Sequence, residues 1–336
     1  MLVAITFAVL ILSTVITMAW SFFSSKAWNP SGRHCYITGG SAGLGLSLAI
    51  LLTKRGADVS IVARSQATLD KALEQIEAAR VSPNQILKAY SYALDTYAAS
   101  VEAFDAVCSA HGGKAPDAVF LCAGVARLGF FVEESEEALR RGMDLTYWVS
   151  AWTAKVASQR MAQSRSQGKI VFVSSILGYA GLIGYSTYSP GKHALRGLAE
   201  TLRQELLLYS IDIHIYFPGT IASPGHVEEN KTKPQITSKI EEQDAAMTPD
   251  YCADGLFKGV ERGDFHIADT FNSELFRCST RGATPYNNIL KDLVYGFIGF
   301  VGLPDWRRGV DKMVVAHRKD HEAHLASNGF YDSAKP

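Results

Sequence analysis

The stretch Thr38-Gly-Gly-Ser-Ala-Gly-Leu-Gly45 decides the fold. It joins a short apolar run, 34–38, to a segment, 44–55, in which apolar residues recur at helical spacing. Glycines let the backbone turn tightly and approach a phosphate, and free N–H groups at a helix start bind that anion. A loop of this kind between a strand and a helix predicts a dinucleotide site. We expect the following loop residues to form it: Gly39, Ser41, Gly43, Leu44 and Gly45.

Strands and helices are expected to alternate beyond this loop. The predicted strands are 34–38, 58–63, 86–94, 118–123, 169–174 and 211–217. The predicted helices are 44–55, 66–80, 98–110, 136–167 and 188–209. Nearly continuous apolar strands are typical of a parallel sheet buried on both faces. Alternating units of this size predict an α/β, Rossmann-type doubly wound fold.

The composition is that of a globular protein. The 336 residues are 47% hydrophobic and 20% charged, which excludes a disordered or fibrous chain. The 33 basic and 33 acidic residues give a net charge of zero, so no basic excess is present to neutralise nucleic-acid phosphates. The five cysteines form no CxxC pair, and such a scattered, odd set favours a reducing compartment.

The N-terminal segment, Met1 to Ser25, is mostly apolar and carries no charged side chain. About 20 apolar residues are enough to cross a bilayer as a helix. A secretory signal peptide would have a positive start and a small-residue cleavage site, which this segment lacks. We therefore expect an uncleaved transmembrane anchor at 1–25. Lys26 and Arg33 follow it, and such positive flanks place the rest of the chain on the cytosolic side.

A second apolar run, Leu293 to Leu303, lies near the C-terminus and is too short to span a bilayer. Two interpretations remain open for it, a re-entrant or interfacial membrane segment and a buried core helix. His317, His321 and His324 follow in a strongly charged tail, where we expect a solvated helical face and no metal site.

These features divide the chain into four regions. The polar stretch 226–243 breaks the alternating pattern and predicts a surface excursion or a lid. The four expected regions are an anchor at 1–25, a dinucleotide-binding catalytic domain at 33–225, a substrate or lid region at 226–288, and a membrane-associated segment with a polar tail at 289–336.

The end of the second predicted strand bears on the choice of dinucleotide. A carboxylate there would bind the ribose 2′-hydroxyl of NAD. This chain instead has Ala63-Arg64-Ser65, and Arg64, helped by Ser41, can pair with the 2′-phosphate of NADP. The sequence therefore favours NADPH. Asp95 either accepts a hydrogen bond from the adenine amine or caps the next helix.

A phenol and an ammonium stand four residues apart in Tyr188-Ser-Pro-Gly-Lys192, which places them on one face of a helix. A nearby ammonium favours the phenolate and is expected to lower the phenol pKa from its usual value of about 10. Ser175 follows the fifth predicted strand, at the sheet edge where doubly wound folds bind ligands. We therefore expect Ser175 and Tyr188 to converge over the cofactor.

Together with Cys122-Ala-Gly124 and Pro218-Gly219, these motifs resemble the short-chain dehydrogenase/reductase family in order and spacing. The resemblance implies an oxidoreductase in which Tyr188 protonates the substrate carbonyl and Ser175 hydrogen-bonds its oxygen. It implies that Lys192 lowers the pKa of Tyr188 and binds the nicotinamide ribose. Cofactor contacts outside the glycine loop are then expected from Ala123, Gly124, Tyr188, Lys192, Pro218, Gly219 and Ile221.

Two features depart from the family pattern. The family has an Asn on the helix after the fourth strand, where it supports a proton-relay water, and the matching position here is Thr146. The relay role then belongs to Thr146 or to the nearby Asp144. Pro190 lies between Tyr188 and Lys192, and because proline is tolerated only in the first helical turn, the helix should begin close to Tyr188.

Two further stretches, 192–200 and 222–234, are similar to the 3-ketosphinganine (3-ketodihydrosphingosine) reductases of that family. This similarity implies NADPH-dependent reduction of the C3 ketone of a long-chain keto amine to sphinganine, in sphingolipid biosynthesis. It also implies an endoplasmic reticulum membrane protein with a cytosolic active site. Within the expected lid, Glu228 or Glu229 could lie near the substrate ammonium, although a solvated charge cluster explains them equally well.

Other functions stay open at this point. A membrane-bound reductase of the same family could act on a steroid, a retinoid or a 3-ketoacyl-CoA. The alternative that is not an enzyme is a membrane-tethered scaffold protein that binds NADPH without turnover. The family often pairs two helices between subunits, so a homo-oligomer is possible, but nothing in the sequence decides it.

Overall fold

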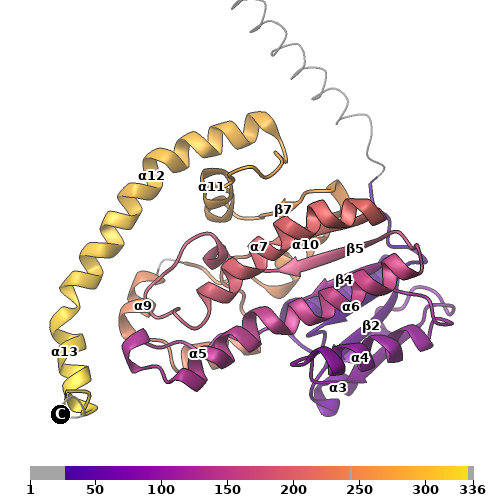
Figure 1. The fold of residues 1–336 in the computed structure, drawn as a ribbon, viewed down its shortest axis with the longest axis horizontal. Coiled ribbons are helices and arrows are strands. Elements are labelled where there is room, and N and C mark those ends of the chain that lie inside the picture. Colours follow the sequence, from indigo (N-terminus) through magenta and orange to yellow (C-terminus); the bar gives the residue numbers. More distant parts are fainter. Residues whose placement is uncertain (1–26, 243, 332–336) are drawn as a thin grey trace, which may run out of the picture.

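The chain folds around a seven-stranded sheet with helices on both faces (Figure 1). The computed structural model describes residues 27–242 and 244–331. In chain order the strands are β1 (His34–Thr38), β2 (Asp58–Ala63), β3 (Leu87–Ser91), β4 (Ala118–Leu121), β5 (Gly168–Val173), β6 (Ile211–Tyr216) and β7 (His266–Ile267).

The strand order is β3-β2-β1-β4-β5-β6-β7, and every neighbouring pair is parallel. The order reverses between β1 and β4, and a doubly wound sheet binds its ligands beyond the carboxyl ends of its strands at such a point. The predicted α/β doubly wound fold is therefore confirmed. β7 was not predicted, because its two residues are too few to form a recognisable apolar run.

The sheet is buried on both faces because successive side chains of each strand point to opposite sides. In β1, Cys35 and Ile37 belong to one hydrophobic cluster, and Tyr36 between them belongs to the other. The first cluster is covered by α2 (Gly43–Lys54), α3 (Gln66–Ala78) and α10 (Pro249–Arg262). The second cluster is covered by α4 (Tyr97–Ser109), α6 (Val149–Gln163) and α7 (Ser189–Glu205).

The remaining helices are shorter or lie outside the sheet. They are η1 (Phe131–Glu133), α5 (Glu136–Met143), η2 (Asp144–Trp148), η3 (Ile176–Gly178), η4 (Leu206–Tyr209), α8 (Pro224–Asn230), α9 (Gln235–Ile240), α11 (Phe271–Ser279), α12 (Ile289–Ala316) and α13 (Arg318–Ser327). The helix predicted at 136–167 is interrupted, because η2 is a π-helical turn between α5 and α6. The polar stretch 226–243 forms most of α8 and all of α9.

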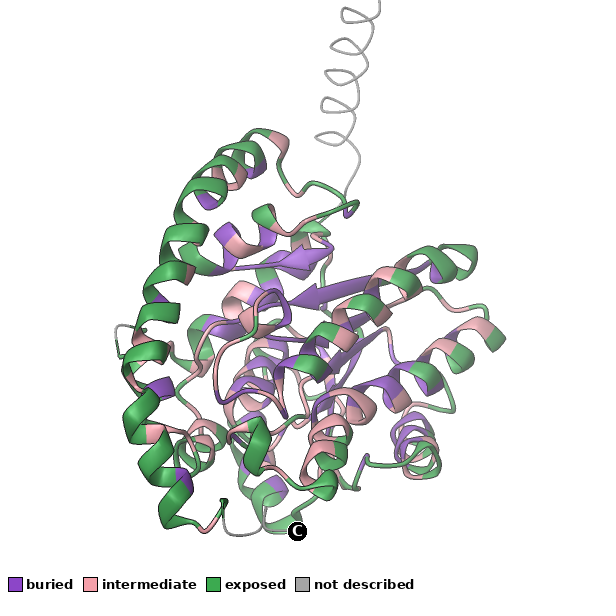
Figure 2. Ribbon diagram, turned by 60° about the vertical axis from the view of Figure 1, so that its left-hand side comes forward, coloured by how far each residue is buried: buried purple, intermediate pink, exposed green. Residues whose placement is uncertain are grey.

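The C-terminal apolar run lies within the long helix α12, which reaches from α11 past α9 (Figure 1). Leu293, Phe297 and Phe300 of this helix are exposed, at 56%, 71% and 76%. Figure 2 shows α12 and α13 as largely exposed. The alternative of a buried core helix is therefore wrong, because only one side of α12 meets the rest of the protein.

None of the helices within residues 27–242 and 244–331 is both long enough and apolar enough to cross a bilayer. The anchor predicted at 1–25 lies outside the described residues.

The histidines of the C-terminal tail contact the loop before α5. His324 on α13 lies 2.9 Å from the Oε1 atom of Glu133, and the ring of His321 packs against Phe130 with 4.3 Å between centroids. Among the residues that the structure describes, no group of three or more His, Cys, Asp or Glu side chains could hold a metal ion. These histidines fasten α13 to η1.

Buried histidines make the fold sensitive to acid. His34 stacks on His111 with 3.4 Å between ring centroids, and burial, helped by His111, lowers the pKa of His34 from 6.5 to about 3. The folded state therefore binds fewer protons than the unfolded state between these values, so stability is full above pH 6.5 and is lost as the pH falls. We expect His34→Gln to reduce the loss of unfolding free energy between pH 7 and pH 5 by about 2 kcal/mol.

Urea unfolding at several pH values measures this effect. His193→Gln, at an exposed position on α7, is the matched control and should keep the wild-type pH dependence. Parallel pH profiles for wild type and His34→Gln would contradict the prediction.

Candidate active site

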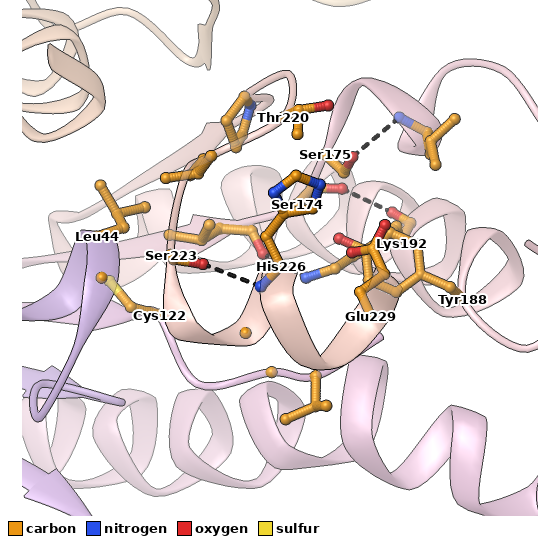
Figure 3. A pocket seen from close by; sticks show the side chains of 18 of the residues that line it. Leu44, Cys122, Ser174, Ser175, Tyr188, Lys192, Thr220, Ser223, His226 and Glu229 are labelled. Atoms are coloured by element: carbon orange, nitrogen blue, oxygen red, sulfur yellow. Dashed lines mark hydrogen bonds between the residues drawn. The ribbon is translucent and has the colours of Figure 1, made fainter. Parts of the chain in front are cut away.

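One cavity of about 1160 Å³ runs along the carboxyl ends of the strands. It begins at the glycine loop, passes the residues that follow β4, β5 and β6, and ends between α8, α11 and α12. Figure 3 shows residues from these separate segments, among them Leu44, Cys122, Tyr188 and Glu229, around the same space. The cavity therefore unites the predicted cofactor loop with the predicted catalytic residues.

The glycine loop is shaped to hold a ligand close to its backbone. Gly39 has a φ of +66°, and a Cβ there would lie 2.9 Å from the backbone nitrogen of Ala123. A Cβ on Gly45 would overlap the carbonyl oxygen of Gly39. The N-cap of α2, Ala42, has no side-chain oxygen to accept from the first-turn N–H groups, whereas Ser65 and Thr96 cap α3 and α4. These free donors fit the pyrophosphate of a dinucleotide.

The end of the cavity that lies away from α12 is lined by the residues predicted to bind the adenosine half of the dinucleotide. Arg64 is exposed at the tip of β2, lines the cavity and forms no ion pair within the described chain. Asp95 also lines the cavity. The alternative role of Asp95 as a helix cap is wrong, because the Thr96 hydroxyl accepts from the N–H of Ala99 and caps α4.

The middle of the cavity is formed by the segments after β4 and β6. Ala123 and Gly124 line it, and a Cβ on Gly124 would lie 3.7 Å from the Nζ atom of Lys192. Pro218, Gly219 and Ile221 line it from the other side, as do the loop residues Ser41, Gly43 and Leu44. All cofactor residues predicted from the sequence thus surround one space.

Ser175, Tyr188 and Lys192 converge in the same cavity. The hydroxyl of Ser175 accepts a hydrogen bond from the N–H of Leu177 at 3.2 Å and also hydrogen-bonds the phenol of Tyr188. Lys192 donates from Nζ to the carbonyl of Val173 at 3.0 Å. Helix α7 begins at Ser189 with its proline in the first turn, as predicted, so Tyr188 and Lys192 face the end of β5 together.

The electrostatics of this group differ from the prediction. Burial raises the pKa of the Tyr188 phenol, the charge of Glu229 acts in the same direction, and the hydrogen bond with Ser175 opposes both. Burial also lowers the pKa of Lys192 to about 8. The expected lowering of the Tyr188 pKa is therefore wrong for the protein alone, because burial of the phenol raises this pKa.

Thr146 is not brought to the cavity. It is 1% exposed, and its hydroxyl donates to the carbonyl of Gly142 at 2.6 Å within the helix. A Cβ on Gly191 of α7 would overlap the Thr146 hydroxyl, so this threonine is packed between helices. Asp144, the alternative relay residue, does line the cavity.

The sequence analysis missed a polar cluster beside Tyr188, which we call the lid network. The Tyr185 hydroxyl lies 2.8 Å from Glu229 and 2.7 Å from Glu241, and Lys233 pairs with the same two carboxylates at 3.2 Å and 2.7 Å. Glu228 is exposed and pairs with Lys231, so Glu229 is the residue of that pair that lines the cavity. These contacts span 44 and 56 residues of sequence, and no local pattern signals them.

The end of the cavity opposite the glycine loop has an apolar wall. It is formed by Phe271, Leu275, Phe276, Ile298, Leu303 and Trp306 from α11 and α12. A buried ion pair links these helices, since Arg277 of α11 contacts Asp292 of α12 at 2.5 Å and also pairs with Glu274 of its own helix at 2.6 Å. Arg307 also donates to the carbonyl of Gly181 at 2.9 Å, which fixes α12 across the cavity.

Comparison with known proteins agrees with this geometry. A sequence model of the short chain dehydrogenase family matches residues 33–234. The chain belongs to this family. It is therefore an oxidoreductase.

The chain is similar over nearly its whole length to proteins of one activity. It is 44% identical over 97% of both chains to a 3-ketodihydrosphingosine reductase of Cryptococcus neoformans. It is 31% identical over 83% of both chains to a 3-dehydrosphinganine reductase of Danio rerio. The similarity to the fungal protein continues beyond residue 234, into the region that contains α11 and α12.

Solved structures share the fold at lower identity. A short chain dehydrogenase of Burkholderia phymatum in complex with NAD has a TM-score of 0.64 at 19% identity, over 71% of this chain and 89% of that one. A short-chain dehydrogenase of Sphingobium yanoikuyae in complex with NADPH has a TM-score of 0.60 at 22% identity, over 70% and 87%. These structural similarities show that the chain has the same fold as these two dehydrogenases.

The close approach at Gly45 leads to a test of the cofactor loop. Because a Cβ there would overlap the Gly39 carbonyl, Gly45→Ala should weaken NADPH binding at least about tenfold and lower the melting temperature. Titration of protein fluorescence with NADPH measures the affinity. Gly197→Ala is the matched control, since nothing lies within 4 Å of a Cβ at this exposed helical position. Equal NADPH affinities for the two variants would contradict the assignment.

Proposed function

We propose that this chain reduces the C3 ketone of 3-ketosphinganine to the alcohol of sphinganine, in sphingolipid biosynthesis, with NADPH as the cofactor. The observation that carries the proposal is the single cavity that joins the glycine loop, the catalytic group and the apolar wall of α11 and α12. A ketone beside Tyr188 then has an apolar surface beyond it for an alkyl chain. The names of the relatives that match along almost the whole chain support the same substrate.

The residues of the chain supply positioning and the proton. A bound NADPH supplies the hydride that converts the C3 carbonyl carbon to an alcohol carbon. The N–H of Leu177 donates a hydrogen bond to the Ser175 hydroxyl oxygen. The hydroxyl proton of Ser175 is therefore free to be donated to the ketone oxygen. Tyr188 donates its proton to that oxygen, and the resulting phenolate is reprotonated from solvent. The raised pKa of Tyr188 suits this direction, because the phenol stays protonated until the oxygen becomes basic.

Lys192 stabilises the phenolate that forms on Tyr188. Its Nζ lies 5.4 Å from the centroid of the Tyr188 ring, and the Val173 carbonyl holds it in place. With its pKa lowered to about 8, Lys192 is mostly cationic at neutral pH. One of its three donors is used by Val173, and the others remain for the cofactor ribose.

The preference for NADPH rests on Arg64. Ser65 caps α3 and no carboxylate stands at the tip of β2, so Arg64 is the charged side chain at the position where a ribose 2′-substituent would lie. A guanidinium can bind a phosphate through two parallel hydrogen bonds. Ser41 lines the same end of the cavity and offers a further hydroxyl donor.

Membrane association completes the proposal. We place the protein in the endoplasmic reticulum membrane through the apolar segment 1–25, with the catalytic domain on the cytosolic side. The exposed apolar residues of α12, including Phe297 and Phe300, support contact with the bilayer surface. Ile298 and Leu303 of the same helix line the cavity, so a lipid substrate can pass from the bilayer along α12 to Tyr188.

The reaction and the proton donor are tested together by NADPH oxidation in detergent-solubilised protein given 3-ketosphinganine. Tyr188→Phe removes the donor and should lower turnover by about 10²–10⁴-fold. Tyr251→Phe is the control, because the Tyr251 hydroxyl donates to the Asp269 carbonyl at the surface, away from the cavity. Turnover of Tyr188→Phe close to that of wild type would refute the assigned donor, and no turnover by wild type would refute the substrate.

Cofactor choice is tested at Arg64. Loss of the phosphate contact in Arg64→Ala should raise the KM for NADPH about tenfold or more and change the KM for NADH much less. Lys71→Ala, an exposed cation on α3 outside the cavity, should leave both values unchanged. Equal shifts in the two KM values for Arg64→Ala would show that Arg64 does not read the 2′-phosphate.

A further inference from the structure

The lid network holds more negative charge than positive charge. Glu229 and Glu241 share one ammonium, that of Lys233, and one phenol proton, that of Tyr185. The side chains of Glu229 and Glu241 are only 18% and 16% exposed, and that of Lys233 is 5% exposed. Two carboxylates beside one ammonium leave about one negative charge without a partner in a poorly hydrated place, which is unfavourable unless a cation arrives.

No other described side chain supplies that cation by direct pairing. Arg141 also lines the cavity, but it is exposed on α5 and forms no ion pair with either carboxylate among the described residues. Lys231 pairs with Glu228 at 2.6 Å on the outer side of α8. The part of the cavity beside Glu229 and Glu241 is therefore a place where a positively charged ligand group is favoured.

That place lies next to the reacting group. The Tyr185 ring is 5.9 Å from the Tyr188 ring, and the charge of Glu229 acts on the Tyr188 phenol. Figure 3 shows Glu229 and Tyr188 among the side chains that line this part of the cavity. In a keto amine of the proposed kind, the amine is on the carbon adjacent to the ketone. When Tyr188 holds the ketone oxygen, the ammonium of the same substrate molecule therefore lies near enough for a neighbouring side chain to bind it.

We propose that Glu229 is a specificity-determining residue that binds the primary ammonium of the substrate, with Tyr185, Glu241 and Lys233 holding it in position. The inference rests on the proposed function and deepens it. Glu229 comes from α8, which abuts the cofactor loop, since a Cβ on Gly43 would lie 3.1 Å from Ser223 at the N-cap of that helix. The ammonium and the cofactor are therefore bound from the same segment.

The arrangement gives the substrate one orientation. Its cationic head faces Glu229, its ketone faces Tyr188, and its alkyl chain extends toward Phe276 and Trp306 in the apolar wall. A neutral long-chain ketone can use the apolar wall but gains nothing from Glu229. The enzyme should therefore select keto amines over ketones of the same length.

Two substrates and two variants test this role. The substrates are 3-ketosphinganine and the matched long-chain ketone that lacks the amine, and kcat/KM is measured for each with detergent-solubilised full-length protein. Glu229→Gln keeps the shape of the side chain and removes its charge. It should lower the ratio of the two kcat/KM values, keto amine over ketone, at least about tenfold, mostly through KM.

Glu228→Gln is the matched control, because Glu228 is the exposed neighbour that pairs with Lys231 outside the cavity. It should keep the wild-type ratio. A ratio that stays at the wild-type value in Glu229→Gln would overturn the proposal, as would equal losses on both substrates, which would indicate a structural role in the lid. Wild-type protein that reduces neither substrate would instead refute the proposed function.

Inhibition of the wild-type protein provides an independent measurement if Glu229→Gln does not fold. A long-chain primary amine and the alcohol of equal length compete with the substrate for the apolar wall, and only the amine can pair with Glu229. The amine should inhibit at least about tenfold more strongly. Equal inhibition constants would overturn the proposal.

Discussion

The buried ammonium of Lys192 is the constraint on which the active site depends. Its Nζ is bonded to the carbonyl of Val173 at the end of β5, and its own carbonyl accepts from the hydroxyl of Ser174 in the next position. These two bonds fasten the first turns of α7 to the sheet edge, and Tyr188 is thereby held against Ser175. The burial that this requires is unfavourable for the ammonium, as its lowered pKa of about 8 shows, and it also keeps the phenol of Tyr188 protonated.

In the proposed function, the residues that select the substrate come from segments outside this core. The lid network comes from the loop before α7, from α8 and from the segment around α9, and the apolar wall comes from α11 and α12. The buried Arg277 of α11 joins the two helices of the wall, because it binds Asp292 of α12. The wall therefore depends on a charged group that does not line the cavity, while the proposed reaction depends on Ser175, Tyr188 and Lys192.

Local patterns made most of the core predictable. The glycine loop, the apolar strands and the four-residue spacing of Tyr188 and Lys192 each lie within one short segment, so the sequence contains the whole signal. The apolar stretch at 293–303 was ambiguous because a helix exposed on one side and a buried helix share the same composition. Thr146 was assigned by alignment of motifs, but the π-helical turn at η2 directs its hydroxyl to a helix carbonyl. The lid network joins residues 44 and 56 positions apart and could only be found in three dimensions.

The central claim is that one cavity binds the substrate head at Tyr188 and its alkyl chain along α12. The most direct test is photolabelling with a 3-ketosphinganine analogue that carries a diazirine midway along its chain, followed by mass spectrometric mapping of the labelled peptides. The account predicts labels on α11 and α12, around Phe276, Ile298 and Trp306, that excess unlabelled substrate suppresses. Labels at the Arg64 end of the cavity, or labels on α12 that the substrate does not suppress, would contradict it.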